Sequence, residues 1–191
     1  MVGIALGLWV AVVVVVGGLL LAPHLVALPA PAATDPHLRT ALARELSSGR
    51  WSVAHIMYRS CACSRRTIAH LVTRLRPAEL EETVIMVDDT GAAGPEDRAL
   101  RAAGFHVTVI TPTTLRERFH VEAAPLLVVG RPDGELAYVG GYNRRKQSRA
   151  YEDLAIINDL RTQTARTSLP IFGCATSERL AGALDPLGLR R

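Results

Sequence analysis

The sequence predicts an α/β fold, with a central mixed sheet, helices on both faces and an N-terminal transmembrane helix in front of it. Three observations support this prediction. The first charged side chain is Asp35, so the chain opens with a long uncharged segment. Short apolar runs, which are typical of buried strands, then alternate with segments of helical periodicity, and this alternation favours a mainly parallel sheet. The last two apolar runs flank the turn Arg131-Pro132-Asp133-Gly134, which is typical of a hairpin and adds antiparallel edge strands.

The N-terminal segment is long enough to cross a bilayer. No charged residue occurs from Val2 to Ala22. A helix over these residues would reach roughly 31 Å at about 1.5 Å per residue, close to the thickness of the hydrocarbon core. We therefore expect residues 1–22 to be a transmembrane anchor, with a cleaved signal segment as the alternative, because Ala30-Pro31-Ala32 offers small residues at cleavage-site spacing. Residues 23–36 are rich in proline and alanine and predict an extended linker.

The first half of the remaining chain alternates helices with apolar strands. A first helix is expected over residues 37–48, where Leu38, Leu42 and Leu46 recur at four-residue spacing after a candidate N-cap at Asp35. Proline and glycine mark the ends of the later helices. In order, we expect a strand over 51–58, a helix over 61–76, a strand over 83–88, a helix over 95–103, a strand over 106–110 and a short helix over 113–119.

The second half predicts a hairpin, a helix and a tail. The hairpin strands are expected over 125–129 and 135–140, and a long helix over 143–165. Residues 166–191 lack clear periodicity, and their apolar stretch from Leu169 to Cys174 predicts a tail that packs on the domain. The expected organisation is a transmembrane anchor or signal segment over 1–22, a linker over 23–36, one domain over 37–165 and a tail over 166–191.

The composition excludes several classes of protein. With 49% hydrophobic and 21% charged residues, the chain of 191 residues is globular and has room for one ordinary domain. The net charge is only +4 and the arginines are dispersed in ones and twos, which disfavours a nucleic-acid partner. Three cysteines are too few for a disulfide-rich scaffold or an ordinary iron–sulfur cluster, so any cysteine chemistry is local. The arginine-heavy, alanine-rich composition is typical of a high-GC bacterial genome.

The motif Cys61-Ala62-Cys63-Ser64 lies where an expected buried strand leads into a helix. At a helix start, unpaired backbone N–H groups and the helix dipole stabilise a negative charge, so they lower the pKa of a thiol placed there. Arg65 and Arg66 add positive charge nearby. The pattern therefore predicts a reactive cysteine.

Strand, cysteine motif and helix in this order resemble the opening of the thioredoxin fold, and the resemblance extends over roughly residues 51–165. The segment Val121 to Pro125 resembles the thioredoxin segment whose proline is cis and packs beside the reactive cysteine. A cis proline there implies that the backbone of Ala124 pairs with an extended substrate. His55 lies six residues before Cys61, where thioredoxins carry the buried carboxylate that takes a proton from the cysteine pair.

The motif departs from the thioredoxin pattern at one position. The resemblance makes Cys61 the nucleophile and puts Ser64, rather than Cys63, at the position of the resolving cysteine. Three outcomes stay open: Cys61 works as a monothiol, Cys63 closes a strained bond with it, or Cys174 returns from the tail as the resolving thiol. A structural role for the cysteines and for His55 is the simpler alternative.

The resemblance implies a thiol–disulfide oxidoreductase that acts on protein thiols or disulfides without a cofactor. Together with the N-terminal apolar segment, it predicts a membrane-anchored protein that faces an oxidising, extracytoplasmic space. Whether the chain reduces, oxidises or isomerises depends on a potential that the sequence does not give. The expected catalytic residues are Cys61, Cys63, Cys174 and His55, and the expected substrate-binding residues are Ala124 and Pro125.

A copper(I)-binding or copper-delivery protein is the alternative function. Cys61 and Cys63, together with His55, His70 or Cys174, would supply two or three soft ligands. Thioredoxin-like copper-delivery proteins resemble a C-x-x-x-C pattern, which this sequence lacks. A module that only docks a partner through an open sheet edge is a third possibility, but it leaves the placement of the cysteines unexplained.

Overall fold

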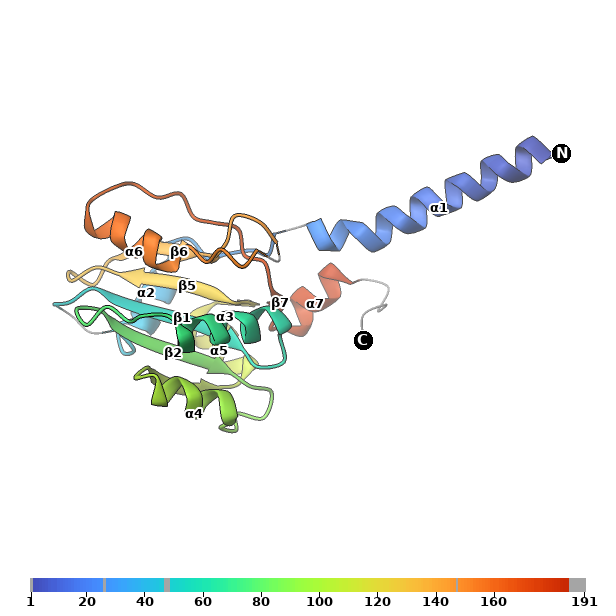
Figure 1. Ribbon diagram of the computed structural model, residues 1–191. Coiled ribbons are helices and arrows are strands. Elements are labelled where there is room, and N and C mark those ends of the chain that lie inside the picture. Colours follow the sequence, from blue (N-terminus) through green and yellow to red (C-terminus); the bar gives the residue numbers. More distant parts are fainter. Residues whose placement is uncertain (1, 26, 47–48, 147, 186–191) are drawn as a thin grey trace.

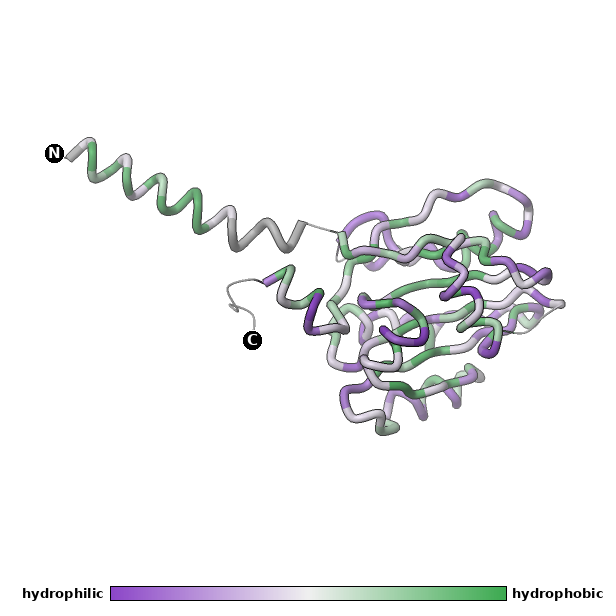
Figure 2. The backbone as a smooth tube through the Cα atoms, turned by 180° about the vertical axis from the view of Figure 1, so that it is seen from behind, coloured by the Kyte–Doolittle hydropathy of each residue, from purple (hydrophilic) through white to green (hydrophobic). Residues whose placement is uncertain are grey.

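A computed structural model of the chain describes residues 2–25, 27–46, 49–146 and 148–185 (Figure 1). Helix α1 (Val2–Leu25) extends away from a layered domain that contains every other helix and strand. Hydrophobic residues gather along the strands of this domain and along much of α1, whereas the outer loops are largely hydrophilic (Figure 2). The mixed α/β architecture expected from the sequence is confirmed.

The N-terminal region differs from the expectation in two respects. The side chains that the structure describes in α1 are those of residues 3–18, and no helix within the described part of the chain is long and apolar enough to cross a membrane. The transmembrane helix expected over residues 1–22 is therefore not confirmed. In the expected linker, Leu28 is buried and its backbone N–H donates to the carbonyl of Ile171 at 2.9 Å. Part of the linker thus packs on the domain.

The central sheet has five strands in the order β3-β2-β1-β5-β6. The first three strands of the chain pair in parallel, and the hairpin that follows adds antiparallel strands on the other side of β1. Apolar side chains cover both faces of the middle strands, which is why these segments appear in the sequence as continuous apolar runs. The strands are β1 (Ser52–Tyr58), β2 (Glu81–Val87), β3 (His106–Ile110), β5 (Leu126–Gly130) and β6 (Leu136–Gly140).

Two layers of helices cover the sheet. On one face, Leu42 and Phe119 of the first layer join Ile56 in one hydrophobic core. On the other face, Leu71 and Leu100 join Met57 in a second core. The first layer comprises α2 (Pro36–Leu42) and α5 (Pro112–Phe119), and the second comprises α3 (Ala62–Thr73), α4 (Pro95–Ala102) and α6 (Asp153–Arg161).

A second, very small sheet lies beside the central one. It joins β4 (Ala123–Ala124) to β7 (Cys174–Ala175) in antiparallel register, and the short helix α7 (Glu178–Leu184) follows. The sequence analysis did not foresee β4, β7 or α7. Strands of two residues have no periodicity to detect, and their pairing links segments about fifty residues apart in the chain.

Three helix boundaries were wrong. The long helix expected over 143–165 is helical only from Asp153 to Arg161, because the preceding run is almost entirely polar and has no apolar face to bury. The helix expected over 37–48 ends at Leu42, and residues 47–48 lie outside the described residues. Helix α3 ends at Thr73 rather than at residue 76, because Arg74 adopts an extended conformation.

Candidate redox-active site

The junction between β1 and α3 positions Cys61. Cys61 is the N-cap residue of α3, its side chain is fully buried, and its Sγ lies 3.9 Å from the carbonyl oxygen of Ala124. Ser64 is buried one turn into the helix, where its hydroxyl accepts a hydrogen bond from the backbone N–H of Tyr58 at 3.0 Å. The residue at the position of a thioredoxin resolving cysteine thus fixes the turn instead of supplying a thiol.

The structure pairs Cys61 with Cys174 in a disulfide, with their Cα atoms 5.8 Å apart. The two residues are separated by 113 positions, so the bond ties the start of α3 to the C-terminal tail. Cys63 stays a free, half-buried thiol two residues along. Among the three outcomes that the sequence left open, this arrangement is the one in which the tail supplies the partner cysteine.

The backbone beside the disulfide is already paired. The Ala124–Pro125 peptide bond is cis, as the resemblance implied. Ala124 lies opposite Cys174 and Ala123 lies opposite Ala175 in the small sheet. The chain's own tail therefore lies along the backbone that the sequence analysis assigned to an extended substrate.

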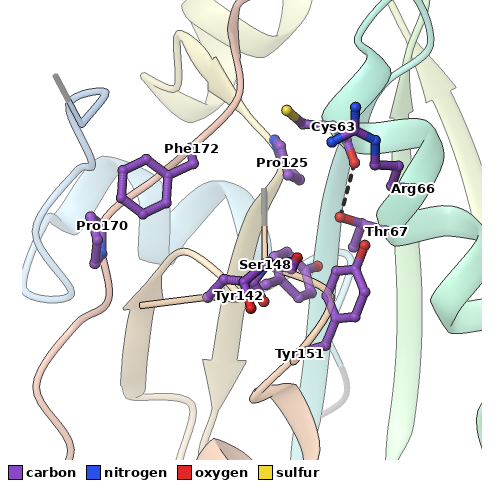
Figure 3. Close-up of a pocket in the computed structure, with 10 residues that line it drawn as sticks. Cys63, Arg66, Thr67, Pro125, Tyr142, Ser148, Tyr151, Pro170 and Phe172 are labelled. Atoms are coloured by element: carbon purple, nitrogen blue, oxygen red, sulfur yellow. Dashed lines mark hydrogen bonds between the residues drawn. The ribbon is translucent and has the colours of Figure 1, made fainter. Parts of the chain in front are cut away.

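A small pocket of about 30 Å³ lies next to this sheet, with room for only one or two water molecules. Cys63 and Pro125 line one part of it, and Tyr142 and Tyr151 line another (Figure 3). The tail closes the pocket with Pro170 and Phe172, and further lining residues are Arg66, Thr67, Asn143 and Ser148. Cys63 is thus the one described free thiol on the pocket wall.

His55 lies fully buried in the middle of β1. Its Nδ1 lies 2.8 Å from the hydroxyl of Tyr142 and its Nε2 lies 3.3 Å from Oε1 of Glu82. Burial lowers the pKa of His55 below its ordinary value, although the hydrogen bond and charge of Glu82 oppose this effect. The ring is therefore neutral near pH 7, and the carboxylate at Nε2 places the proton there, so Nδ1 accepts from Tyr142.

Glu82 is the acidic centre of a buried polar network. Its burial raises its pKa, but the hydrogen bonds from His55 and Arg74 and the positive charge of Arg74 outweigh this effect and hold the pKa at about 2. Arg74 pairs with Glu82 and also lies 2.9 Å from Asp153, which in turn pairs with His70 at 2.9 Å. Burial likewise raises the pKa of Asp153, and its bonds to His70 and Arg74 reverse the direction. The buried network therefore keeps the carboxylates of Glu82 and Asp153 ionised beside the guanidinium group of Arg74.

The sequence analysis named His55 but did not link it to Tyr142, Glu82, Arg74 or Asp153. It also expected His55 to serve the cysteines directly. Among the described residues the hydrogen-bond partners of His55 are Tyr142 and Glu82, and of these two Tyr142 lines the pocket. One available signal was Glu82, a charged residue directly before the apolar run that forms most of β2.

The geometry does not support the copper alternative. Cys61 is oxidised in its bond with Cys174, and His70 is engaged by Asp153. Within the described residues, no three or more side chains of histidine, cysteine, aspartate or glutamate gather in a way that could hold a metal ion.

Several solved structures are similar to this chain, whereas no protein-family model and no curated protein matches it. An uncharacterised conserved protein from Geobacillus kaustophilus is 13% identical, with a TM-score of 0.52 over 71% of this chain and 80% of that one. The thioredoxin domain of a thiol-disulfide oxidoreductase from Bacteroides vulgatus is 11% identical, with a TM-score of 0.37 over 62% and 81%. A putative thioredoxin from Neisseria meningitidis is 15% identical, with a TM-score of 0.39 over 72% and 90%.

At these identities the first of these similarities bears on the fold alone. The mixed sheet, the cysteine at the start of α3 and the cis proline before β5 are features that the resemblance stated from the sequence implied. The observed architecture is consistent with the thioredoxin-like fold that the sequence resemblance implied.

Proposed function

We propose that the chain is a protein thiol–disulfide oxidoreductase that uses Cys61 and Cys174 as its redox pair. The observation that supports this proposal is the disulfide between a cysteine at the N-terminus of α3 and a cysteine of the tail, beside the cis bond before Pro125. A helix start favours the thiolate form of Cys61 once the bond is reduced. The partners are protein thiols or disulfides, and the reaction needs no cofactor because cysteine sulfur carries both electrons.

The proposed reduction has two steps. The thiolate of Cys61 attacks one sulfur of a substrate disulfide, the substrate S–S bond breaks, and the departing substrate sulfur takes up a proton. The thiolate of Cys174 then attacks Sγ of Cys61, the mixed disulfide breaks, and the second substrate sulfur leaves as a thiol. Two electrons pass from the protein dithiol to the substrate, and the Cys61–Cys174 bond forms. The same steps in reverse oxidise a substrate dithiol, and the reduction potential sets the direction.

The buried network offers a path for the proton. Tyr142 lines the same pocket as Cys63, and its hydroxyl donates to Nδ1 of His55, whose Nε2 faces Glu82. A proton that enters the pocket reaches His55 when the hydroxyl of Tyr142 accepts it and passes its own proton on. His55 and Tyr142 therefore act as positioning and proton-handling residues behind the cysteines.

Trapping experiments test the assignment of the two cysteines. The Cys61→Ser chain is expected to lose reduction of insulin disulfides. The Cys174→Ser chain is expected to accumulate mixed disulfides through Cys61, because the second step is missing, and the matched Cys63→Ser control is expected to keep turnover. Mixed disulfides that accumulate in Cys63→Ser instead, with normal turnover in Cys174→Ser, would reverse the assignment of the resolving cysteine.

We also propose that the N-terminal segment holds the domain at the cell membrane on its extracytoplasmic side. The uncharged run from Val2 to Ala22 supports the membrane attachment. The disulfide between Cys61 and Cys174 supports the extracytoplasmic side, because oxidising compartments maintain such bonds. Membrane fractionation and N-terminal sequencing of the mature protein test it. A mature N-terminus at Ala33 would contradict retention of the anchor.

A further inference from the structure

We call the tail residues from Leu169 to Ser177 the C-terminal strap. The strap lines one side of the small pocket and contains Cys174, which forms the disulfide with Cys61. The strap is held along its length by backbone hydrogen bonds. The carbonyl of Leu169 accepts from the N–H of Gly141 at 2.8 Å, and that of Ile171 accepts from Leu28 at 2.9 Å. Ile171 is fully buried in the core of the α2 face. The strap is therefore an integral part of the folded domain in the oxidised state.

The strap pairs with β4 in the way that a bound extended peptide would. Cys174 lies opposite Ala124, Ala175 lies opposite Ala123, and the N–H of Thr176 donates to the carbonyl of Glu122 at 2.8 Å. Cys174 is at the same time bonded to Cys61. A strand paired with β4 and joined by sulfur to Cys61 has all the parts of a mixed disulfide between this protein and an extended peptide.

We propose that the C-terminal strap is a tethered occupant of the substrate-binding edge at β4, and that substrate peptides must displace it and are themselves displaced when it returns. This inference rests on the proposed exchange reaction. In the resolving step, Cys174 attacks Sγ of Cys61 while β7 pairs again with β4, so closing of the strap and release of the reduced substrate thiol are one event. No further oxidant or reductant is involved, because the electrons are those of the two protein thiols.

Gly173 defines the chemical class of peptide that fits. A Cβ atom at Gly173 would overlap the carbonyl oxygen of Ala124 and would lie 2.7 Å from Cδ of Pro125. A peptide held in the same register meets the same two atoms. The site therefore selects an extended segment in which glycine directly precedes the reacting cysteine.

The space around the strap suits displacement. On one side lies the pocket that Pro170 and Phe172 share with Cys63 and Pro125 (Figure 3). On the other side, a hollow of about 790 Å³ is bounded by the strap residues Ala175 to Ser177 and by residues at the start of α5. The strap is thus a wall common to both spaces, and its departure leaves an open channel across β4.

A capture assay tests the inference with Cys61 as the sole thiol. The full chain carries Cys63→Ser and Cys174→Ser, and its substrate is a peptide of residues 168–177 whose cysteine bears thionitrobenzoate. Attack by Cys61 on the peptide sulfur releases thionitrobenzoate, which is measured by absorbance. A second peptide has alanine in place of glycine before the cysteine. We expect the glycine peptide to react about tenfold faster than the alanine peptide.

Strap variants on the same background measure the competition. Gly173→Ala in the protein is expected to raise the capture rate of the glycine peptide about tenfold, because the altered strap docks poorly. Gly182→Ala is the matched control, because a Cβ atom there meets nothing within 4 Å. Gly141→Ala is a second variant that disturbs the strap from outside it, since its Cβ would overlap the carbonyl oxygen of Pro170. Circular dichroism identifies any variant that does not fold.

The outcomes separate the strap from the exchange function. Equal rates for the two peptides, together with no effect of Gly173→Ala and Gly141→Ala, would overturn the inference and leave the exchange function standing. Failure of Cys61 to release thionitrobenzoate from any peptide in any folded variant would overturn both.

Discussion

Two regions flank the β1–α3 unit, and they are held together by different forces. Behind β1, the ionised Glu82 and Asp153 are buried against Arg74, with side-chain exposures of 5% or less. In front of it, Cys61 and the strap are joined by one covalent bond and a short backbone ladder. We therefore expect the first region to respond to pH and the second to redox potential. On our proposal, the domain keeps a fixed interior while the edge at β4 opens and closes.

The largest expected effect comes from breaking the buried network. Glu82→Gln removes the buried carboxylate that Arg74 and the partly exposed Arg76 share and leaves Arg74 with Asp153 alone, and it is expected to lower the free energy of unfolding by about 3–5 kcal/mol. Chemical denaturation measures this loss. Glu135→Gln is the matched control, because its pair with Arg39 is about half exposed and contributes at most about 1 kcal/mol. Equal effects of the two changes would show that the network does not support the fold.

Reduction of the disulfide is expected to act at the strap. Loss of a bond that closes a loop of 113 residues is expected to lower stability by about 2–4 kcal/mol. Denaturation with and without a reductant measures the difference, and the Cys174→Ser chain should no longer respond to the reductant. If the reductant destabilised Cys174→Ser as strongly, the bond would not be the cause.

The fold was more predictable than the site, for physical reasons. The strands β1 and β2 were foreseen because each contains a continuous apolar run buried on both faces, and β3 because it is a short run rich in β-branched residues. The helix expected over residues 143–165 was too long, because the residues before Asp153 are mostly polar and give no signal of where the helix begins. The partner of Cys61 was left open because the choice between Cys63 and Cys174 depends on where the tail returns.

The buried network was missed for a related reason. His55 and Tyr142 are 87 residues apart, and His70 and Asp153 are 83 residues apart. Pairings over such distances leave no spacing in the sequence. Only the folded sheet brings these side chains to one place.

Acid is expected to weaken the interior before it affects the disulfide. The pKa of His55 is lowered below its ordinary value of 6.5, so its neutral form stabilises the fold fully above that pH. As the pH falls below about 6.5, the unfolded chain binds a proton that the folded chain does not, and stability falls by at most about 1.4 kcal/mol per pH unit. Denaturation between pH 7 and pH 5 is expected to show this slope.

Two variants check the assignment of that slope. His55→Gln should flatten it between pH 7 and pH 5, while the exposed His106→Gln should not change it. An unchanged slope in His55→Gln would assign the effect to another group.

The smallest expected effect comes from the exposed ion pair between Arg179, which follows the strap in α7, and Glu122. Arg179 pairs with Glu122 at 2.5 Å, but its side chain is 75% exposed. Arg179→Ala is therefore expected to weaken strap closure by about 0.5 kcal/mol, which corresponds to roughly a twofold shift in the glutathione equilibrium of the Cys61–Cys174 bond. A shift of tenfold or more would mean that this ion pair, rather than the pairing of β4 with β7, controls how the strap closes on the domain.

The most direct measurement of the central claim is mass-spectrometric mapping of the cysteines in the full chain after alkylation at a series of glutathione ratios. The account predicts a reversible bond between Cys61 and Cys174 with a defined potential, while Cys63 is alkylated throughout. A reversible Cys61–Cys63 bond, or three cysteines that stay unpaired at every ratio, would contradict it.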